Sequence, residues 1–282
     1  MSSPNIHYRL GKSVAFKVVV TILAFLITVP LILIIGYIFK AGISTINWHF
    51  LTHIPKPVGE LGGGIANALV GSLIIVFTAA IMAIPLGIMC GIYLSENKTA
   101  KLAYWSRLAV DILQGVPSIV IGIVVYFWVV KPAGGFSAFS GSVALAIMML
   151  PIIIRSTEET LKLLPDSLKE AALALGIPYH RVILSVIVPC GISGILSGVI
   201  LSVARIAGET APLLFTAFGN PYLSADLRRP MQSLPLLIFN YATSPYEEWR
   251  NLAWGASLIL LVWVLLLNIF TKVITRKWKI QL

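Results

Sequence analysis

Long apolar runs recur along the chain, and each is about as long as a membrane-crossing helix. A helix needs about 20 predominantly apolar residues to cross a bilayer. Six charge-free runs meet this requirement, at residues 18–39, about 66–93, 112–130, 136–154, 182–204 and 251–271. Glycines and serines near the start of the fourth predict that it begins late and continues past Arg155. The pattern predicts an all-α polytopic membrane protein with six transmembrane helices.

Lysine and arginine are distributed unevenly between the segments that separate these runs. Fourteen lie on one side and six on the other, while Arg205 falls within or beside a span. Cytoplasmic segments of membrane proteins carry an excess of Lys and Arg, so the richer side is predicted to be cytoplasmic. Because that side includes both ends of the chain, both termini are predicted to be cytoplasmic.

Composition supports a membrane protein and narrows its chemistry. Of the 282 residues, 58% are hydrophobic and 11% are charged, which is too apolar for a typical soluble domain. The net charge of +10 is explained by anchoring at the cytoplasmic face, so no nucleic-acid partner is predicted. Cys90 and Cys190 both lie in apolar runs and indicate neither a disulfide framework nor a metal site. His49 and His53 have the spacing of metal ligands but no further ligand nearby, so they are predicted to lie in a loop.

One cytoplasmic segment, residues 165–182, interrupts the apolar pattern. Ser167 and Glu170 have the spacing of a capping box, and Pro165 just before them fits a helix start. Gly176 is placed to end that helix with a positive φ, and Pro178 suits the first turn of a second helix. The segment is therefore predicted to be helix, glycine and helix at the membrane surface. These signals alone fit either a helix resting on lipid headgroups or a contact site for another protein.

A second unusual segment places charge beside the fifth span. Arg205 and Glu209 are four residues apart on one helical face, and ionisable groups in a membrane usually pair or face a cavity. Arginine matches oxyanions with its fork of donors, and Thr210 adds a neutral donor. Gly208 and Pro212 are both able to break the helix here. Simple pairing and direct binding of an anion are both consistent with this pattern.

The cytoplasmic segment resembles the EAA loop of ABC-importer permeases. The chain has Glu170-Ala171-Ala172, three residues, Gly176, nine residues, and then Val186-Ile187-Val188-Pro189. The family pattern ends in Ile-x-Leu-Pro, so valine stands here at both aliphatic positions. In that family the loop forms a coupling helix that docks on an ATPase. The resemblance implies that Glu170, Ala171, Ala172 and Gly176 make this contact, and residues 165–182 are called the coupling loop below.

The segment RIAGETAPLLFTAFGN, residues 205–220, is similar to the permeases of phosphate-specific ABC importers. Further matches lie at residues 83–87, 92–96, 115–120 and 150–155, so the likeness covers roughly residues 62–272. The pair Ala211-Pro212 resembles the A-type member of the two related permeases. The resemblance implies the type I, MetI-like permease fold. It also implies a substrate path that includes Arg205, Glu209, Thr210, Arg155 and Ser118.

For two of these residues an ordinary structural role is equally open. Arg155 at the inner end of the fourth span fits a topology anchor as well as a transport residue. Gly115, Pro117 and Ser118 are expected to bend the third span, and helix packing alone explains such a glycine and proline. Glu158-Glu159 and Glu247-Glu248 are predicted to be solvated.

The resemblance also implies partners and a mechanism. A soluble binding protein delivers inorganic phosphate to the outer face of a heterodimer of this chain and a C-type permease. Two copies of an ABC ATPase bind ATP-Mg and move the coupling loops, so this chain is expected to be no enzyme, with no catalytic residue, metal or cofactor of its own. Its expected place is the cytoplasmic (inner) membrane of a bacterium or archaeon, in contact with membrane lipid.

The expected organisation has three parts. Residues 1–60 hold a cytoplasmic tail, the first span and an outer loop, residues 61–274 form the transport core with the coupling loop, and residues 275–282 form a basic tail. Two other functions remain open from the sequence. One is an ABC permease for another oxyanion, such as molybdate or sulfate, and the other is a secondary transporter that needs no ATPase.

Overall fold

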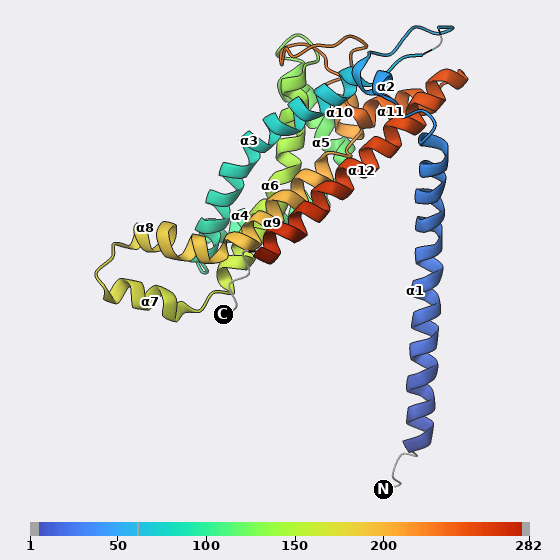
Figure 1. Ribbon diagram of the computed structural model, residues 1–282. Helices are drawn as coiled ribbons and strands as arrows, with labels where there is room; N and C mark the ends of the chain where they lie inside the picture. The colour runs from blue at the N-terminus through green and yellow to red at the C-terminus, as the bar shows by residue number, and fades with distance from the viewer. Residues whose placement is uncertain (1–5, 61, 278–282) are drawn as a thin grey trace.

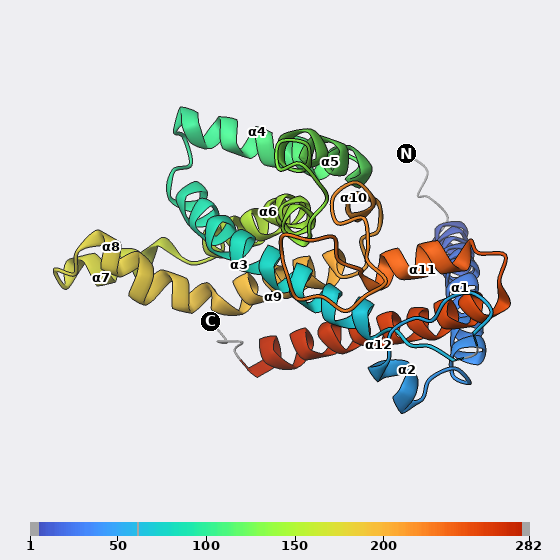
Figure 2. The same cartoon turned by 90° about the horizontal axis from the view of Figure 1, so that it is seen from above.

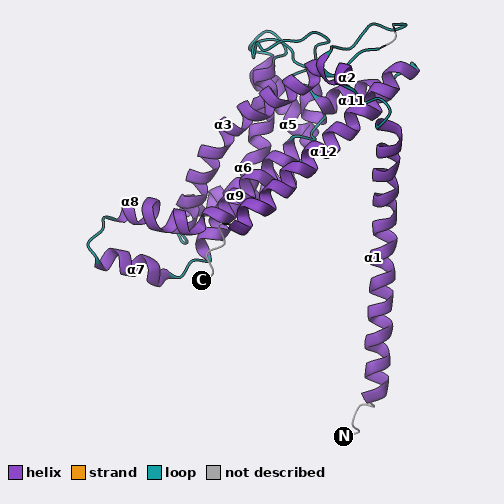
Figure 3. Ribbon diagram, viewed as in Figure 1, coloured by secondary structure: helices purple, strands orange, loops and turns teal. Residues whose placement is uncertain are grey.

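The computed structural model describes residues 6–60 and 62–277, and within those ranges the chain is helical without a strand, as Figure 3 shows. The helices are α1 (Ile6–Gly42), α2 (Trp48–Thr52), α3 (Ala66–Glu96), α4 (Lys101–Gly115), α5 (Ser118–Val125), α6 (Ala138–Lys162), α7 (Asp166–Ala174), α8 (Tyr179–Val182), α9 (Val188–Ile206), α10 (Ala211–Leu214), α11 (Leu234–Ala242) and α12 (Glu247–Lys277). Turns of π-helix at Tyr126–Val130 and Ile183–Ile187 extend α5 and join α8 to α9. The predicted tail at 275–282 lies outside the described residues from residue 278 onward.

Among the described residues, five helices are long and apolar enough to cross a membrane, and the bent pair of α4 and the α5 segment makes six when it is counted as one span. The five are α1, α3, α6, the continuous α8–α9 segment and α12. The predicted continuation of the fourth span past Arg155 is confirmed, because α6 runs from Ala138 to Lys162. The predicted third span, residues 112–130, is bent by 108° between α4 and the α5 segment.

Pro117 explains the break in the third span. Proline lacks a backbone N–H and steers the residue before it away from helical geometry. Val116 accordingly has ψ 128° and Pro117 has ψ 138°, both extended. The expected bend at residues 115–118 is therefore confirmed, and it is sharp enough to make α4 a separate helix. Figure 2 shows α4 and α5 along one side of the molecule, with α6 between α4 and α9.

Helix α6 is the centre of the bundle and packs most extensively on α3 and α9. Of the most apolar 18-residue stretch of α6, 67% is buried within the chain. Glycines on both neighbours allow this close approach: Gly87 and Gly91 of α3 face α6, as do Gly194 and Gly198 of α9. Small residues at helix contacts are the usual means of close packing in membranes. The helices α3, α6 and α9 therefore form one tightly packed unit.

A leucine at Gly91 is expected to destabilise this unit. A Cβ at Gly91 would lie 2.5 Å from the Thr157 Cβ and 2.9 Å from the Ile154 carbonyl oxygen. Overpacking of this kind costs about 1–3 kcal/mol, so Gly91→Leu should lower the midpoint temperature of thermal unfolding in detergent. The control is Gly36→Leu on α1, where a Cβ meets nothing within 4 Å. Equal midpoints for the two variants would contradict the close contact of α3 with α6.

Helix α1 stands apart from the bundle for most of its length (Figure 1). In the most apolar 18-residue stretch of α1, 0% is buried within the chain. It contacts α12 near its C-terminal end, where the Tyr37 and Trp254 rings lie 5.0 Å apart and Gly42 approaches the Trp254 carbonyl. A helix that is apolar on all sides suits a lipid environment.

The short helices α2 and α11 are not revealed by the apolar pattern. The predicted loop at His49 and His53 is instead α2, which begins after Asn47, whose side chain accepts a hydrogen bond from the Phe50 amide. The two imidazole rings stack with centroids 3.7 Å apart, and no cluster of three candidate metal ligands occurs among the described residues. Helix α11 packs against α12 through a buried cluster that includes Leu237 and Ala256.

Candidate functional site

The coupling loop projects from one end of the bundle, which is called the coupling end (Figure 1). Gly176 has φ +77°, so the predicted left-handed turn between two helices is confirmed. The predicted capping box is wrong, because α7 begins two residues earlier, at Asp166, and Ser167 lies in its first turn. Pro165 occupies the cap position with an extended backbone, and Pro178 does the same for α8. Proline therefore sets the start of both helices.

The two faces of α7 differ in exposure. Leu168 and Ala172 point inward and pack with the buried side chains of Leu161 and Ile187. Glu170, Ala171 and Gly176 are exposed. Three of the four residues expected to contact an ATPase are therefore accessible to a partner. Ala172 is 7% exposed and instead lets α7 lie close to the bundle.

A buried carboxylate near the coupling end gathers three cations. The Glu158 side chain is fully buried, and its oxygens lie 2.6 Å from Arg107 Nε, 3.1 Å from Arg155 Nη1 and 2.5 Å from Lys162 Nζ. Arg155 also pairs with Asp111 of α4. Arg107 donates to the carbonyls of Leu94 and Lys98 as well. This Glu158 cluster joins α4 to α6 and to the turn before α4.

The prediction that Glu158 is solvated is wrong, whereas that for Glu159 is confirmed. Glu247 and Glu248 are also exposed, as expected. Glu158 is buried because α4 folds back against α6 after the turn that follows α3. The spacing of Arg155, Glu158 and Lys162 puts all three on one helical face, which is a signal for ion pairing within α6. Arg107 lies 51 residues away, and no local pattern indicates its contact.

Glu158→Gln is expected to lower stability far more than Glu159→Gln. It leaves three cations around an uncharged group, and breaking a buried ion pair costs about 3–5 kcal/mol. Because the Lys162 side chain is 35% exposed, solvent screens part of this loss, and about 2–3 kcal/mol is expected. Thermal unfolding of the two purified variants measures the difference. Identical midpoints would show that the cluster does not stabilise the fold.

The Arg205 region lies where α9 ends. The helix stops at Ile206 and α10 begins at Ala211, so the break expected near Gly208 and Pro212 is confirmed and lies at residues 207–210. The Arg205 Nε lies 3.7 Å from the Glu209 Oε1, and the Arg205 side chain is 54% exposed. Thr210 occupies the cap position of α10 and is half-buried. The pairing is thus observed, and the guanidinium retains exposed surface.

The structure does not bring all predicted substrate-path residues together. Arg155 belongs to the Glu158 cluster, and the hydroxyl of its neighbour Ser156 donates to the Gly194 carbonyl of α9. Arg205 is eleven residues beyond Gly194, which is about 16 Å along a helix. Ser118 is half-buried in the first turn of α5, directly after the bend. Any path that uses all three residues extends along the bundle.

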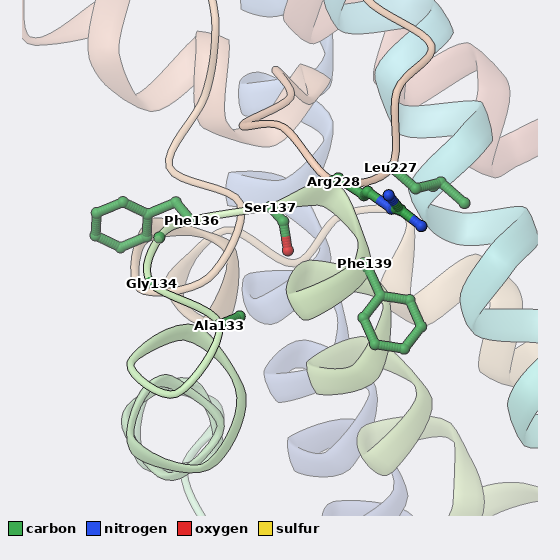
Figure 4. Close-up of a pocket in the computed structure, with 8 residues that line it drawn as sticks. Ala133, Gly134, Phe136, Ser137, Phe139, Leu227 and Arg228 are labelled. Carbon is green, nitrogen blue, oxygen red and sulfur yellow. The ribbon is translucent and has the colours of Figure 1, made fainter.

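An open cavity of about 610 Å³ lies at the end opposite the coupling loop, called the far end. It is formed by the turn before α6 and by the segment before α11, as Figure 4 shows. Ser137 and Arg228 lie on its wall, with Phe136 and Phe139. None of the predicted site residues lines it. The sequence gives no motif here, because the wall combines two segments about 90 residues apart.

Known proteins similar to this chain share most of its length. The model of the family described as "binding-protein-dependent transport system inner membrane component" matches residues 83–280. The phosphate transport system permease protein PstA of Yersinia pestis is 48% identical, over 84% of this chain and 81% of that protein. PstA of Pasteurella multocida is 38% identical, over 97% of this chain and 98% of that protein.

Solved structures support the fold. An inward-facing MetNI methionine ABC transporter chain superimposes with a TM-score of 0.65 at 17% identity, covering 76% of this chain and 96% of that one. A chain of an amino acid ABC transporter with histidines gives a TM-score of 0.54 at 16% identity, over 76% and 93%. The predicted MetI-like permease fold is thereby confirmed. The chain therefore belongs to the binding-protein-dependent transport system inner membrane components and, within them, to the PstA family of phosphate transport system permease proteins.

Proposed function

We propose that this permease subunit imports inorganic phosphate and forms half of the translocation path. The observation that carries the proposal is the 48% identity to a phosphate transport permease over 84% of the chain. The half-exposed Arg205 in the last turn of α9, beside the break, supplies an anion-binding group at the end of α9 away from the coupling loop. As a permease, the chain is a non-catalytic component of the importer.

The partners follow from the family and from the exposed loop. A binding-protein-dependent permease of the ABC class works with a substrate-binding protein and an ATPase. We propose that the second permease is a homologous C-type subunit and that two ATPase copies contact the two coupling loops. In this chain the contact falls on the exposed residues Glu170, Ala171 and Gly176. ATP-Mg is then held by the ATPases and not by this chain.

The chain is an inner-membrane component, and we propose that its coupling end is cytoplasmic. The first turns of α1 and the last turns of α12 point toward the same end as α7 (Figure 1). The excess of Lys and Arg lies on that side. The far-end cavity with Arg228 then faces the side from which a binding protein delivers its anion.

In the proposed path, Arg205 binds the entering anion in competition with Glu209. The 3.7 Å separation between them is longer than a good hydrogen bond, so the guanidinium can exchange one oxyanion for another. Glu209 also repels a second anion and prevents the first from remaining bound to Arg205. Thr210 adds a neutral donor beside them.

Reconstitution tests this function. Proteoliposomes that contain the complete complex, ATP and the binding protein are expected to accumulate radioactive phosphate, and the same vesicles without ATP are not. Excess sulfate or molybdate should leave uptake unchanged; strong competition would favour another oxyanion. Uptake by this chain alone, driven by an ion gradient, would contradict the proposal and indicate a secondary transporter.

A further inference from the structure

One carboxylate on a membrane-spanning helix holds both arms of the coupling loop. Glu96, the last residue of α3, accepts hydrogen bonds from the Lys169 ammonium and the Tyr179 hydroxyl through the same oxygen. Lys169 Nζ also lies 4.8 Å from the centre of the Tyr179 ring. Lys169 belongs to α7 and Tyr179 begins α8, so these groups close the loop on either side of Gly176. They are called the Glu96 tether.

The tether is sheltered from water. The side chains of Glu96 and Lys169 are 16% and 24% exposed. Burial alone would lower the pKa of Lys169, but hydrogen bonding to Glu96 and its charge outweigh burial and raise that pKa above its ordinary value. The ammonium therefore stays charged at neutral pH. A partly buried charged pair is more sensitive to loss of one partner than a solvated surface pair.

Chain connectivity explains why a link to α3 matters. The loop follows α6 directly and runs through α8 into α9, so a force on the loop reaches those two helices along the backbone. Helix α3 has no such covalent connection. Its Ile88 and Ile92 pack on the apolar side of the loop, and its one charged link in this contact is Glu96. Charge-assisted hydrogen bonds are directional, whereas apolar contacts tolerate sliding.

We propose that Glu96 is a positioning residue that makes α3 move with the coupling loop. The inference rests on the proposed function, because it takes an ATPase as the source of the loop's motion. With the tether intact, α3, α6 and α9 move together as the loop moves. Without it, the coupling loop moves relative to the packed unit of α3, α6 and α9, and ATP is hydrolysed without a matching transport step.

The test is the amount of phosphate imported per ATP hydrolysed by the complete complex in proteoliposomes. Glu96→Gln removes the charge, and this ratio is expected to fall about fivefold while ATP hydrolysis stays within about twofold of the unchanged complex. Lys169→Glu should lower the ratio similarly. The exchanged pair Glu96→Lys with Lys169→Glu should restore it to within about twofold, because the attraction is re-formed. Glu159→Gln, at an exposed position on α6, is the control and should leave the ratio unchanged.

The ratio separates positioning from general damage. Loss of folded complex lowers transport and hydrolysis in proportion and does not change their ratio. An unchanged ratio in Glu96→Gln, or an exchanged pair no better than Lys169→Glu alone, would overturn the inference. If Glu96→Gln fails to assemble, Tyr179→Phe removes one hydroxyl and should still lower the ratio; an unchanged ratio there also overturns it. Failure of the proposed function is distinct, because the unchanged complex would then import no phosphate with ATP.

Discussion

Replacing Gly176 by valine is expected to reduce phosphate uptake and phosphate-stimulated ATP hydrolysis about tenfold or more. Gly176 has φ +77°, and left-handed backbone costs an L-residue about 1–2 kcal/mol. The cost is larger for a β-branched side chain such as valine, so we expect the turn to change conformation to relieve the strain. That shift displaces Glu170 and Ala171 from the exposed surface that we propose contacts the ATPase, and 1.4 kcal/mol of lost coupling is already about tenfold. Both activities are measured in reconstituted complexes.

A second glycine provides a matched control. Gly59, in the segment between α2 and α3, has φ +88°, and a Cβ at either glycine would meet nothing within 4 Å. Gly59→Val therefore introduces the same kind of backbone strain away from the coupling loop. It should stay within about twofold of the unchanged complex. Equal activities in the two variants would remove the case for a role of the Gly176 turn in coupling.

Arg205→Gln is expected to abolish most phosphate transport while the complex still assembles. Glutamine keeps donors but loses the charge and the bidentate fork that bind an oxyanion. Hydrogen bonds to charged groups contribute about 1.5–3 kcal/mol, so uptake should fall about 10- to 100-fold. Arg205→Lys retains the charge without the fork. Its phosphate uptake should therefore lie between that of the unchanged complex and that of Arg205→Gln. Initial rates of phosphate uptake over a range of concentrations measure the effect.

Arg229 provides the control for Arg205. It also pairs with a nearby carboxylate, because its Nε lies 3.4 Å from the Asp226 Oδ2, but its side chain is 75% exposed in the segment before α11. Arg229→Gln is expected to transport normally, since exposed ion pairs contribute little. Unchanged uptake kinetics in Arg205→Gln would show instead that Arg205 serves only to pair with Glu209.

The features that the sequence predicts well are those set by local chemistry. Apolar runs of membrane length fix the spans, because each helix must satisfy its own backbone in lipid. Gly176 ends α7 because glycine alone adopts its φ without strain, and the break near Gly208 occurs where charge and proline follow one another. Pro165 and Pro178 likewise mark the starts of the two short helices on either side of Gly176.

The features that the sequence misses depend on contacts between distant segments. Pro117 indicates a bend, but its size depends on how α4 packs against α6. The local pattern predicts a solvated Glu158. The residue is buried only because α4 packs against α6 and brings Arg107 into contact with it. Glu96 meets Lys169 across 73 residues, which no periodicity reveals. Helix α11 is too short for a span and owes its place to burial against α12.

Cross-linking from the coupling loop tests most directly whether a separate ATPase operates this permease. With Cys90 and Cys190 replaced by alanine, Leu175→Cys places a thiol beside Gly176 at a position that is 81% exposed. A thiol-to-amine reagent is expected to join this position to the ATPase in the complete complex and to stop ATP-driven phosphate uptake. Leu223→Cys, 57% exposed at the far end, should give neither result. The account would be contradicted by a complex that imports phosphate while the reagent attached at Leu175→Cys forms no cross-link to the ATPase and reacts only with lipid amines or water.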